Sequence, residues 1–147
     1  MIHHYQETDV TCGPAALRML LARLGHDVPE ATLADALGTD ANGTHADRFE
    51  AVLAARGHTA TVWHGDVVLR DLRDILDGHH VMVCYQSPTL RTGHFALVAD
   101  LADDHVELDD PWFGPCTCIP VDDFLEQWRS EPHQAKVRPR WLLAVPE

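Results

Sequence analysis

The sequence predicts an α+β fold in which N-terminal helices pack on a C-terminal antiparallel sheet. In roughly the first half of the chain, apolar residues recur at helical spacing; in the second half, short apolar or alternating runs are separated by turn residues. The 147 residues are 46% hydrophobic and contain no internal repeat or linker. We therefore expect a single domain over residues 1–147, long enough to bury about 68–70% of the surface that the unfolded chain exposes.

Helical segments are bounded by residues that are typical of helix starts and stops. The first has Pro14 in its first turn and Gly25 just past its end, and Gly38 closes the second. Thr44 is expected to cap the third, and Gly57 to stop it. The expected helices are Pro14–Leu24, Glu30–Leu37, His45–Ala55, Asp66–Leu76 and Val121–Arg129.

Strand segments are short, and several are rich in β-branched residues. Asp103-Asp104 is the expected hairpin turn between two of them. The expected strands are Thr59–Trp63, Val81–Tyr85, His94–Leu101, His105–Leu108, Cys116–Pro120 and Trp141–Val145. Most of them follow one another closely along the chain, which favours antiparallel pairing.

Acidic residues dominate the charge of the chain. It has 11 lysines and arginines against 23 aspartates and glutamates, a formal net charge of −12 with neutral histidines. Such a chain lacks the positive surface of a nucleic-acid-binding protein, and anionic lipid would repel it. We therefore expect no nucleic-acid partner.

The sequence contains no targeting or membrane-spanning signal. No stretch approaches the ~20 consecutive apolar residues that span a bilayer, and the N-terminus lacks the basic end and apolar core of a signal peptide. We therefore expect a cytoplasmic location and no membrane span. In a reducing compartment the four cysteines, Cys12, Cys84, Cys116 and Cys118, are thiols.

The most informative segment is Gln6–Leu17, which places Cys12 at the start of a helix. Unpaired backbone N–H groups and the positive end of the helix dipole favour a thiolate there, and the thiolate is the reactive form of cysteine. Gly13 would let a substrate approach the backbone closely. Gln6 is near enough to aim its amide at an oxyanion beside Cys12. The structural alternative is that Cys12 is a small buried residue.

A nucleophilic cysteine also needs a base. The best candidate is His94, which stands at the start of an apolar strand. The main rival among the other ten histidines is the pair His79-His80, which also precedes an apolar strand.

The base in turn needs a residue that orients it, and two neighbouring acids are candidates. Because strand side chains alternate, Asp110 shares a face with the apolar Val106 and Leu108 and is expected to point inward. Asp109 shares the other face with Glu107 and is expected to be solvated. The structural alternative is that both acids simply end the strand in a turn.

Four short motifs occur in one order: Gln6, then Cys12-Gly13 at a helix start, then His94-Phe95, then Asp110-Pro111. In this order the chain resembles the bacteriocin-processing, double-glycine leader peptidases of the papain-like cysteine peptidase clan. The resemblance runs from about Gln6 to Trp128.

The resemblance implies a papain-like fold and an active cysteine peptidase. By this resemblance, Cys12 of this chain would attack a carbonyl, His94 would transfer the proton, and Asp110 would orient His94. Gln6 and the Cys12 backbone N–H would hold the oxyanion. The resemblance also implies a peptide substrate, cut after small residues of a Gly-Gly type leader, and a peptide exporter as partner. Because the 147 residues include no membrane span or ATPase, we expect a stand-alone peptidase or an excised domain.

Cys116-Thr117-Cys118 suggests a metal site, with His79 or His80 as a further ligand. A single Cys-x-Cys lacks the paired spacing of a structural zinc site, so we expect neither metal nor cofactor. Cys84, within an apolar run, is expected in the core.

Two other functions remain open from the residues alone. A papain-like acyltransferase or amide hydrolase of small-molecule biosynthesis would use the same acyl-enzyme at Cys12, and amine acceptors would distinguish it from a peptidase. A non-catalytic peptide-binding module would keep its function when Cys12 is replaced by alanine.

Overall fold

The computed structural model describes residues 3–129 and 138–147. Its helices are α1 (Cys12–Arg23), α2 (Glu30–Leu37), the 3₁₀ turn η1 (Ala46–Arg48), α3 (Phe49–Ala55), α4 (Leu69–Leu76) and α5 (Val121–Gln127). Its strands are β1 (Thr61–Trp63), β2 (His79–Ser87), β3 (Thr92–Leu101), β4 (His105–Asp110), β5 (Gly114–Pro120) and β6 (Leu142–Pro146).

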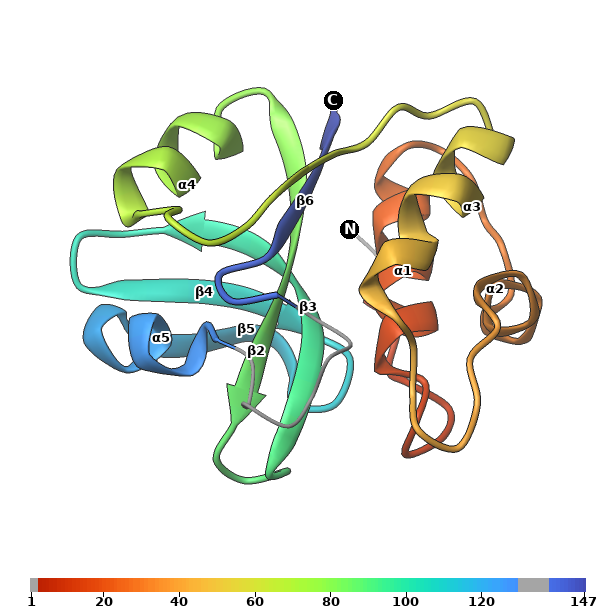
Figure 1. Ribbon diagram of the computed structural model, residues 1–147, viewed down its shortest axis with the longest axis horizontal. Helices are drawn as coiled ribbons and strands as arrows, with labels where there is room; N and C mark the ends of the chain where they lie inside the picture. The colour runs from red at the N-terminus through yellow and green to blue at the C-terminus, as the bar shows by residue number, and fades with distance from the viewer. Residues whose placement is uncertain (1–2, 130–137) are drawn as a thin grey trace.

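The strands form one six-stranded sheet in the order β1-β6-β2-β3-β4-β5, and every neighbouring pair is antiparallel. Helices α1, α2 and α3 lie on one side of the sheet, while α4 and α5 lie on the other (Figure 1). The predicted α+β fold, with N-terminal helices on a C-terminal antiparallel sheet, is therefore confirmed.

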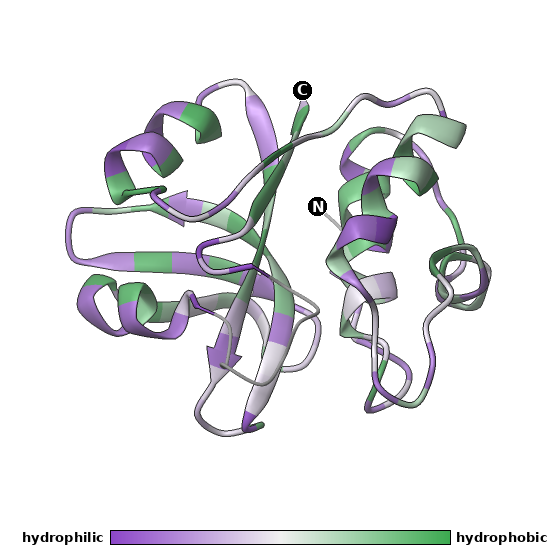
Figure 2. Ribbon diagram, viewed as in Figure 1, coloured by the Kyte–Doolittle hydropathy of each residue, from purple (hydrophilic) through white to green (hydrophobic). Residues whose placement is uncertain are grey.

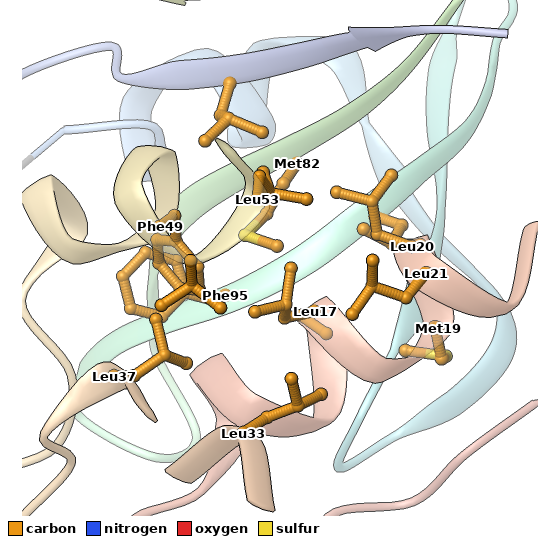
Figure 3. Close-up of a cluster of buried hydrophobic side chains, with 14 of the residues drawn as sticks. Leu17, Met19, Leu20, Leu21, Leu33, Leu37, Phe49, Leu53, Met82 and Phe95 are labelled. Atoms are coloured by element: carbon orange, nitrogen blue, oxygen red, sulfur yellow. The ribbon is translucent and has the colours of Figure 1, made fainter. Parts of the chain in front are cut away.

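A hydrophobic core fills each side of the sheet, because the strand side chains alternate between the two faces. Met82 and Cys84 of β2 pack with the N-terminal helices, as Figure 3 shows for Met82 beside Leu17 and Leu53. Val83 and Tyr85 of β2 instead join the core under α4 and α5. Hydrophobic and hydrophilic residues accordingly alternate along these two helices (Figure 2).

Several predicted boundaries are wrong at the helix starts. The first helix begins two residues early, so that Cys12 belongs to it, and the fourth begins at Leu69 rather than Asp66. Thr44 caps no helix: its hydroxyl hydrogen-bonds with that of Thr39 at 2.7 Å, and the segment after it begins as a 3₁₀ turn.

Strand boundaries differ where pairing continues beyond the apolar run. β4 extends two residues past the predicted end at Leu108, so that Asp110 is its last residue. β2 likewise runs from His79 to Ser87 because β3 and β6 pair with it. Within the two described ranges, no helix has both the length and the apolar composition to cross a membrane.

Candidate active site

Cys12 is the first residue of α1 and is half-buried. The helix can begin here because Pro14, in its first turn, has no N–H that needs an intrahelical partner. The first turn contains no acidic residue, so no carboxylate offsets the positive end of the helix dipole. Cys12 therefore lies at the positive end of the helix dipole.

The loop before Cys12 is held by α2. The backbone N–H of Glu7 donates to both carboxylate oxygens of Glu30, at 3.0 and 3.2 Å, and that of Thr8 donates to the hydroxyl of Thr11 at 3.0 Å. Burial raises the pKa of Glu30, and hydrogen bonds from Glu7 and Thr11 partly oppose this rise. The buried Glu30 therefore fixes the path of the chain into Cys12.

Gly13 is required by packing within the protein. A Cβ atom at this position would lie 2.6 Å from Thr44 Oγ1 and 3.3 Å from the Phe49 ring. The glycine lets α1 pack closely on the segment that leads into α3. The expectation that Gly13 also opens the backbone to a substrate stays a prediction.

His94 lies near the start of β3 and is almost fully buried, with 1% of its surface exposed. Its Nε2 is 2.6 Å from Asp110 Oδ1, which leaves Nδ1 for the hydrogen bond with Cys12. Burial alone would lower the pKa of His94, but the hydrogen bonds to Asp110 and Cys12 and their negative charges raise it to about 9. The surroundings of His94 therefore favour its imidazolium form.

Asp110 is completely buried, and both of its carboxylate oxygens accept hydrogen bonds. Oδ1 accepts from His94 and from the backbone N–H groups of Trp112 and Phe113, at 2.8 and 3.0 Å; Oδ2 accepts from the Tyr85 hydroxyl at 2.5 Å. Burial would raise the pKa of Asp110, but the hydrogen bond and charge of His94 and the hydrogen bond from Tyr85 lower it overall. The network keeps Asp110 ionised and fixed toward His94.

Asp109, expected to be solvated, is instead paired with Arg23. Its carboxylate binds the guanidinium at the end of α1, and the exposed fractions of the two side chains are 16% for Asp109 and 8% for Arg23. The alternation of β4 does turn Asp109 away from Asp110, but α1 covers this part of the opposite face. The prediction failed because a helix from the first half of the chain supplies the partner.

Replacing Asp109 by alanine is expected to lower the free energy of unfolding by about 2–4 kcal/mol, because the mostly buried Arg23 charge would lose its ion pair with this carboxylate. Urea denaturation measures this change. The control is Asp103→Ala, which removes an exposed pair with Arg73 and should leave the midpoint unchanged. Equal midpoints for the two variants would contradict the structural role of Asp109.

Gln6 is held close to the acid by the backbone, since its N–H donates to the carbonyl of Pro111 at 2.8 Å. Its side-chain Nε2 donates to the carbonyl of Thr8 at 2.7 Å. An amide nitrogen carries two hydrogens, so a second one remains for another acceptor. The structure thus brings Gln6 beside the Asp110–Pro111 segment.

Two aromatic residues of the site were missed from the sequence. Tyr85, expected only as a strand residue, pairs with His94 in the β2–β3 register and donates to Asp110. The Phe113 ring lies edge-on to the His94 ring, with centroids 6.2 Å apart, and is 42% exposed. Only the strand register and the turn after Pro111 place them, and no local motif predicts either feature.

The rival histidines lie elsewhere. His79 Nδ1 is hydrogen-bonded to the carbonyl of Ile75 at 2.9 Å, and both His79 and His80 sit where β2 pairs with β6. Cys116 and Cys118 are exposed on β5, which is separated from β2 by the two strands β3 and β4. The fold therefore does not bring Cys116 and Cys118 close to His79 or His80, as the suggested metal site would require.

Cys12 is expected to react with iodoacetamide near neutral pH at least about tenfold faster than Cys84. Cys12 is half-buried beside His94, whereas Cys84 is 4% exposed and burial raises the pKa of its thiol far above its usual value. Peptide mapping by mass spectrometry after short exposures measures both rates. Equal rates would show that the fold does not distinguish the two thiols.

Comparison with protein families gives a match to the Peptidase C39 family over residues 2–131. An uncharacterized protein of Methanothermobacter thermautotrophicus is 33% identical over 112 residues, which are 76% of this chain and 72% of that protein. An uncharacterized protein of Methanothermobacter marburgensis is 33% identical over 109 residues, 74% of this chain and 70% of that protein.

Solved structures share the fold at lower identity. The peptidase domain of Streptococcus ComA, a bi-functional ABC transporter involved in quorum sensing, has a TM-score of 0.77 and 18% identity, covering 98% of this chain and 97% of that one. A double glycine motif protease from an AMS/PCAT transporter, in complex with its leader peptide, has a TM-score of 0.76 and 17% identity, with coverage of 99% and 91%. By its family match and its fold, this chain belongs to the peptidase C39 family and is a cysteine peptidase.

Proposed function

We propose that the chain acts as one papain-like domain that cuts a peptide after small residues, through Cys12, His94 and Asp110 and with Gln6 at the oxyanion. The observation that carries this proposal is the continuous hydrogen-bonded series from Cys12 to His94 to Asp110. A nucleophile, a base and a residue that orients the base are the parts that acyl transfer requires.

In the first half of the proposed reaction, the Cys12 thiolate attacks the carbonyl carbon of the cleaved bond and forms a carbon–sulfur bond. The carbonyl electrons move to oxygen, where the Cys12 backbone N–H and the Gln6 amide stabilise the negative charge. The oxyanion then collapses and the carbon–nitrogen bond breaks. The His94 imidazolium gives its proton to the leaving amine, and an acyl-enzyme remains.

In the second half, neutral His94 takes a proton from water, and the resulting hydroxide attacks the acyl carbon. The carbon–sulfur bond breaks and the Cys12 thiolate leaves. The carboxylic acid product departs and gives its proton to the solvent, and His94 is again an imidazolium beside a thiolate. Asp110 remains ionised throughout and holds the ring in place.

A Gly-Gly type leader is the substrate that we propose. The Phe113 ring beside His94 puts an aromatic surface next to the reacting groups, which favours residues without bulky side chains at the cleaved bond. The similar AMS/PCAT protease was solved with a leader peptide. A peptide exporter would then take up the trimmed product, and the four free thiols suit the reducing cytoplasm.

Mass spectrometry of peptide digests tests the proposal. The peptides differ only in the two residues before the cleaved bond, namely Gly-Gly, Gly-Ala, Ala-Ala and Val-Val, and each digest is repeated with an added amine. We expect hydrolysis after Gly-Gly and Gly-Ala, little after Val-Val, and none by Cys12→Ser. Equal cleavage of Val-Val would contradict the substrate, amide products would indicate an acyltransferase, and binding without cleavage would indicate a peptide-binding module.

Replacing Asp110 by alanine is expected to lower kcat/KM at least about tenfold, or ~1.4 kcal/mol of transition-state stabilisation. The variant should also lose activity at lower pH than the wild type. Asp110 helps to raise the pKa of His94 to about 9, so without it the imidazolium loses its proton at lower pH. The pH profile of kcat/KM measures this alkaline limb.

An alkaline limb at the same pH in both proteins would mean that Asp110 does not hold the His94 proton. Asp109→Ala serves as the matched control, because Asp109 is the next residue along the strand but faces away from His94. Its kcat/KM should stay within a few-fold of the wild type.

A further inference from the structure

We propose that the face of the β4–β5 hairpin opposite Asp110 carries a site for a zinc-class divalent cation, formed by His105, Glu107 and Cys118. One ligand atom from each residue lies within 4.8 Å of the other two. Among residues 3–129 and 138–147, no other group of three or more metal-ligating side chains lies this close together. The site uses none of the residues of the proposed active site.

The strand register makes this juxtaposition a consequence of the fold. His105 and Glu107 are two residues apart on β4, so they share a face, and the core residues Val106 and Leu108 occupy the other. Cys118 of β5 is the direct partner of Glu107. Directly opposite residues of an antiparallel pair have Cβ atoms about 4.5–5.5 Å apart, which brings the third ligand to the same place.

The donor set suits zinc. Imidazole nitrogen, carboxylate oxygen and thiolate sulfur bind Zn²⁺ at about 2.0–2.3 Å, so tetrahedral ligand atoms lie roughly 3.3–3.8 Å apart. His105 and Glu107 are half-buried and Cys118 is exposed, so small rotations can close the remaining gap. Water would complete the coordination.

A carboxylate also lies beside the outer ring nitrogen of His105. His105 Nδ1 is 2.7 Å from Asp104 Oδ1, which leaves Nε2 for a metal. A carboxylate on the second ring nitrogen orients a ligating histidine and increases its basicity. The acidic surroundings favour a cation further, since the chain has a formal net charge of −12.

The test uses untagged protein with a Cys12→Ala substitution, because the Cys12–His94 pair could itself bind a thiophilic metal. Titration with Co²⁺ under a non-chelating reductant reports thiolate ligation by its charge-transfer band and tetrahedral geometry by its visible bands. Competition with Zn²⁺ then gives the zinc affinity. We expect one ion per chain, with both spectral signatures.

Cys118→Ser is expected to remove the thiolate band and weaken zinc binding at least tenfold, and His105→Ala to weaken it similarly. Neither side chain is fully buried, and circular dichroism checks that the variants fold. His80→Ala is the matched control: His80 is a half-buried histidine of β2 and lies outside the group, so binding should change less than threefold. Cys116→Ser is titrated as well, because the Cys116 thiol hydrogen-bonds with Glu107.

Two results would overturn the proposal. Unchanged affinity in Cys118→Ser and His105→Ala would place the ion elsewhere. Equal loss in Cys116→Ser and Cys118→Ser would indicate chelation by the Cys-x-Cys pair instead of the three-residue site. Neither result bears on the peptidase, whose residues lie outside this site.

Discussion

Replacing His94 by alanine is expected to lower kcat/KM by roughly 10⁴-fold or more, the largest effect of any substitution apart from Cys12 itself. His94 is the hydrogen-bond partner of both Cys12 and Asp110. Without it no group generates the thiolate or gives a proton to the leaving amine. Steady-state kinetics on the Gly-Gly peptide measures the loss.

Because His94→Ala also leaves Asp110 buried with one partner fewer, the His94→Gln variant is assayed beside it. Glutamine can still donate to Asp110 but cannot transfer a proton at neutral pH, so this variant should fold and remain inactive. His79→Ala is the matched control, since His79 lies at the opposite end of β2 from Tyr85, the partner of His94, and its Nδ1 is bonded to the carbonyl of Ile75. Activity within tenfold of wild type in His94→Gln would exclude His94 as the base.

Replacing Gln6 by alanine is expected to lower kcat by roughly 10²–10³-fold with a modest change in KM, as for other oxyanion donors. The negative charge on the carbonyl oxygen exists only in the transition state and the tetrahedral intermediate. An amide that stabilises it therefore acts on kcat more than on substrate binding. The hydrogen bonds from Gln6 N–H to Pro111 and from Glu7 N–H to Glu30 keep this residue in place.

Gln127→Ala is the matched control for Gln6, because Gln127 is a half-buried glutamine at the end of α5, on the other side of the sheet. Its kcat should equal that of the wild type. An unchanged kcat in Gln6→Ala would mean that the Gln6 amide serves only its hydrogen bond to Thr8.

The sequence by itself determined the parts of this protein that depend on near neighbours in the chain. Helical and strand periods predict the class of the fold, and Pro14 predicts a helix start next to Cys12. Alternation along β4 predicts that Asp110 points inward with Val106 and Leu108, and all three are buried. These features follow from backbone geometry over a few residues, which a local pattern records.

The tertiary structure alone decided the contacts between residues that are distant in sequence. Asp109 meets Arg23 from 86 residues away, Tyr85 reaches Asp110 through the β2–β3 register, and Thr44 packs against Gly13 instead of capping a helix. Each contact depends on how a helix settles on the sheet or how two strands align. Such alignments minimise exposed apolar area and unpaired polar groups over the whole molecule, and no short segment of sequence contains that information.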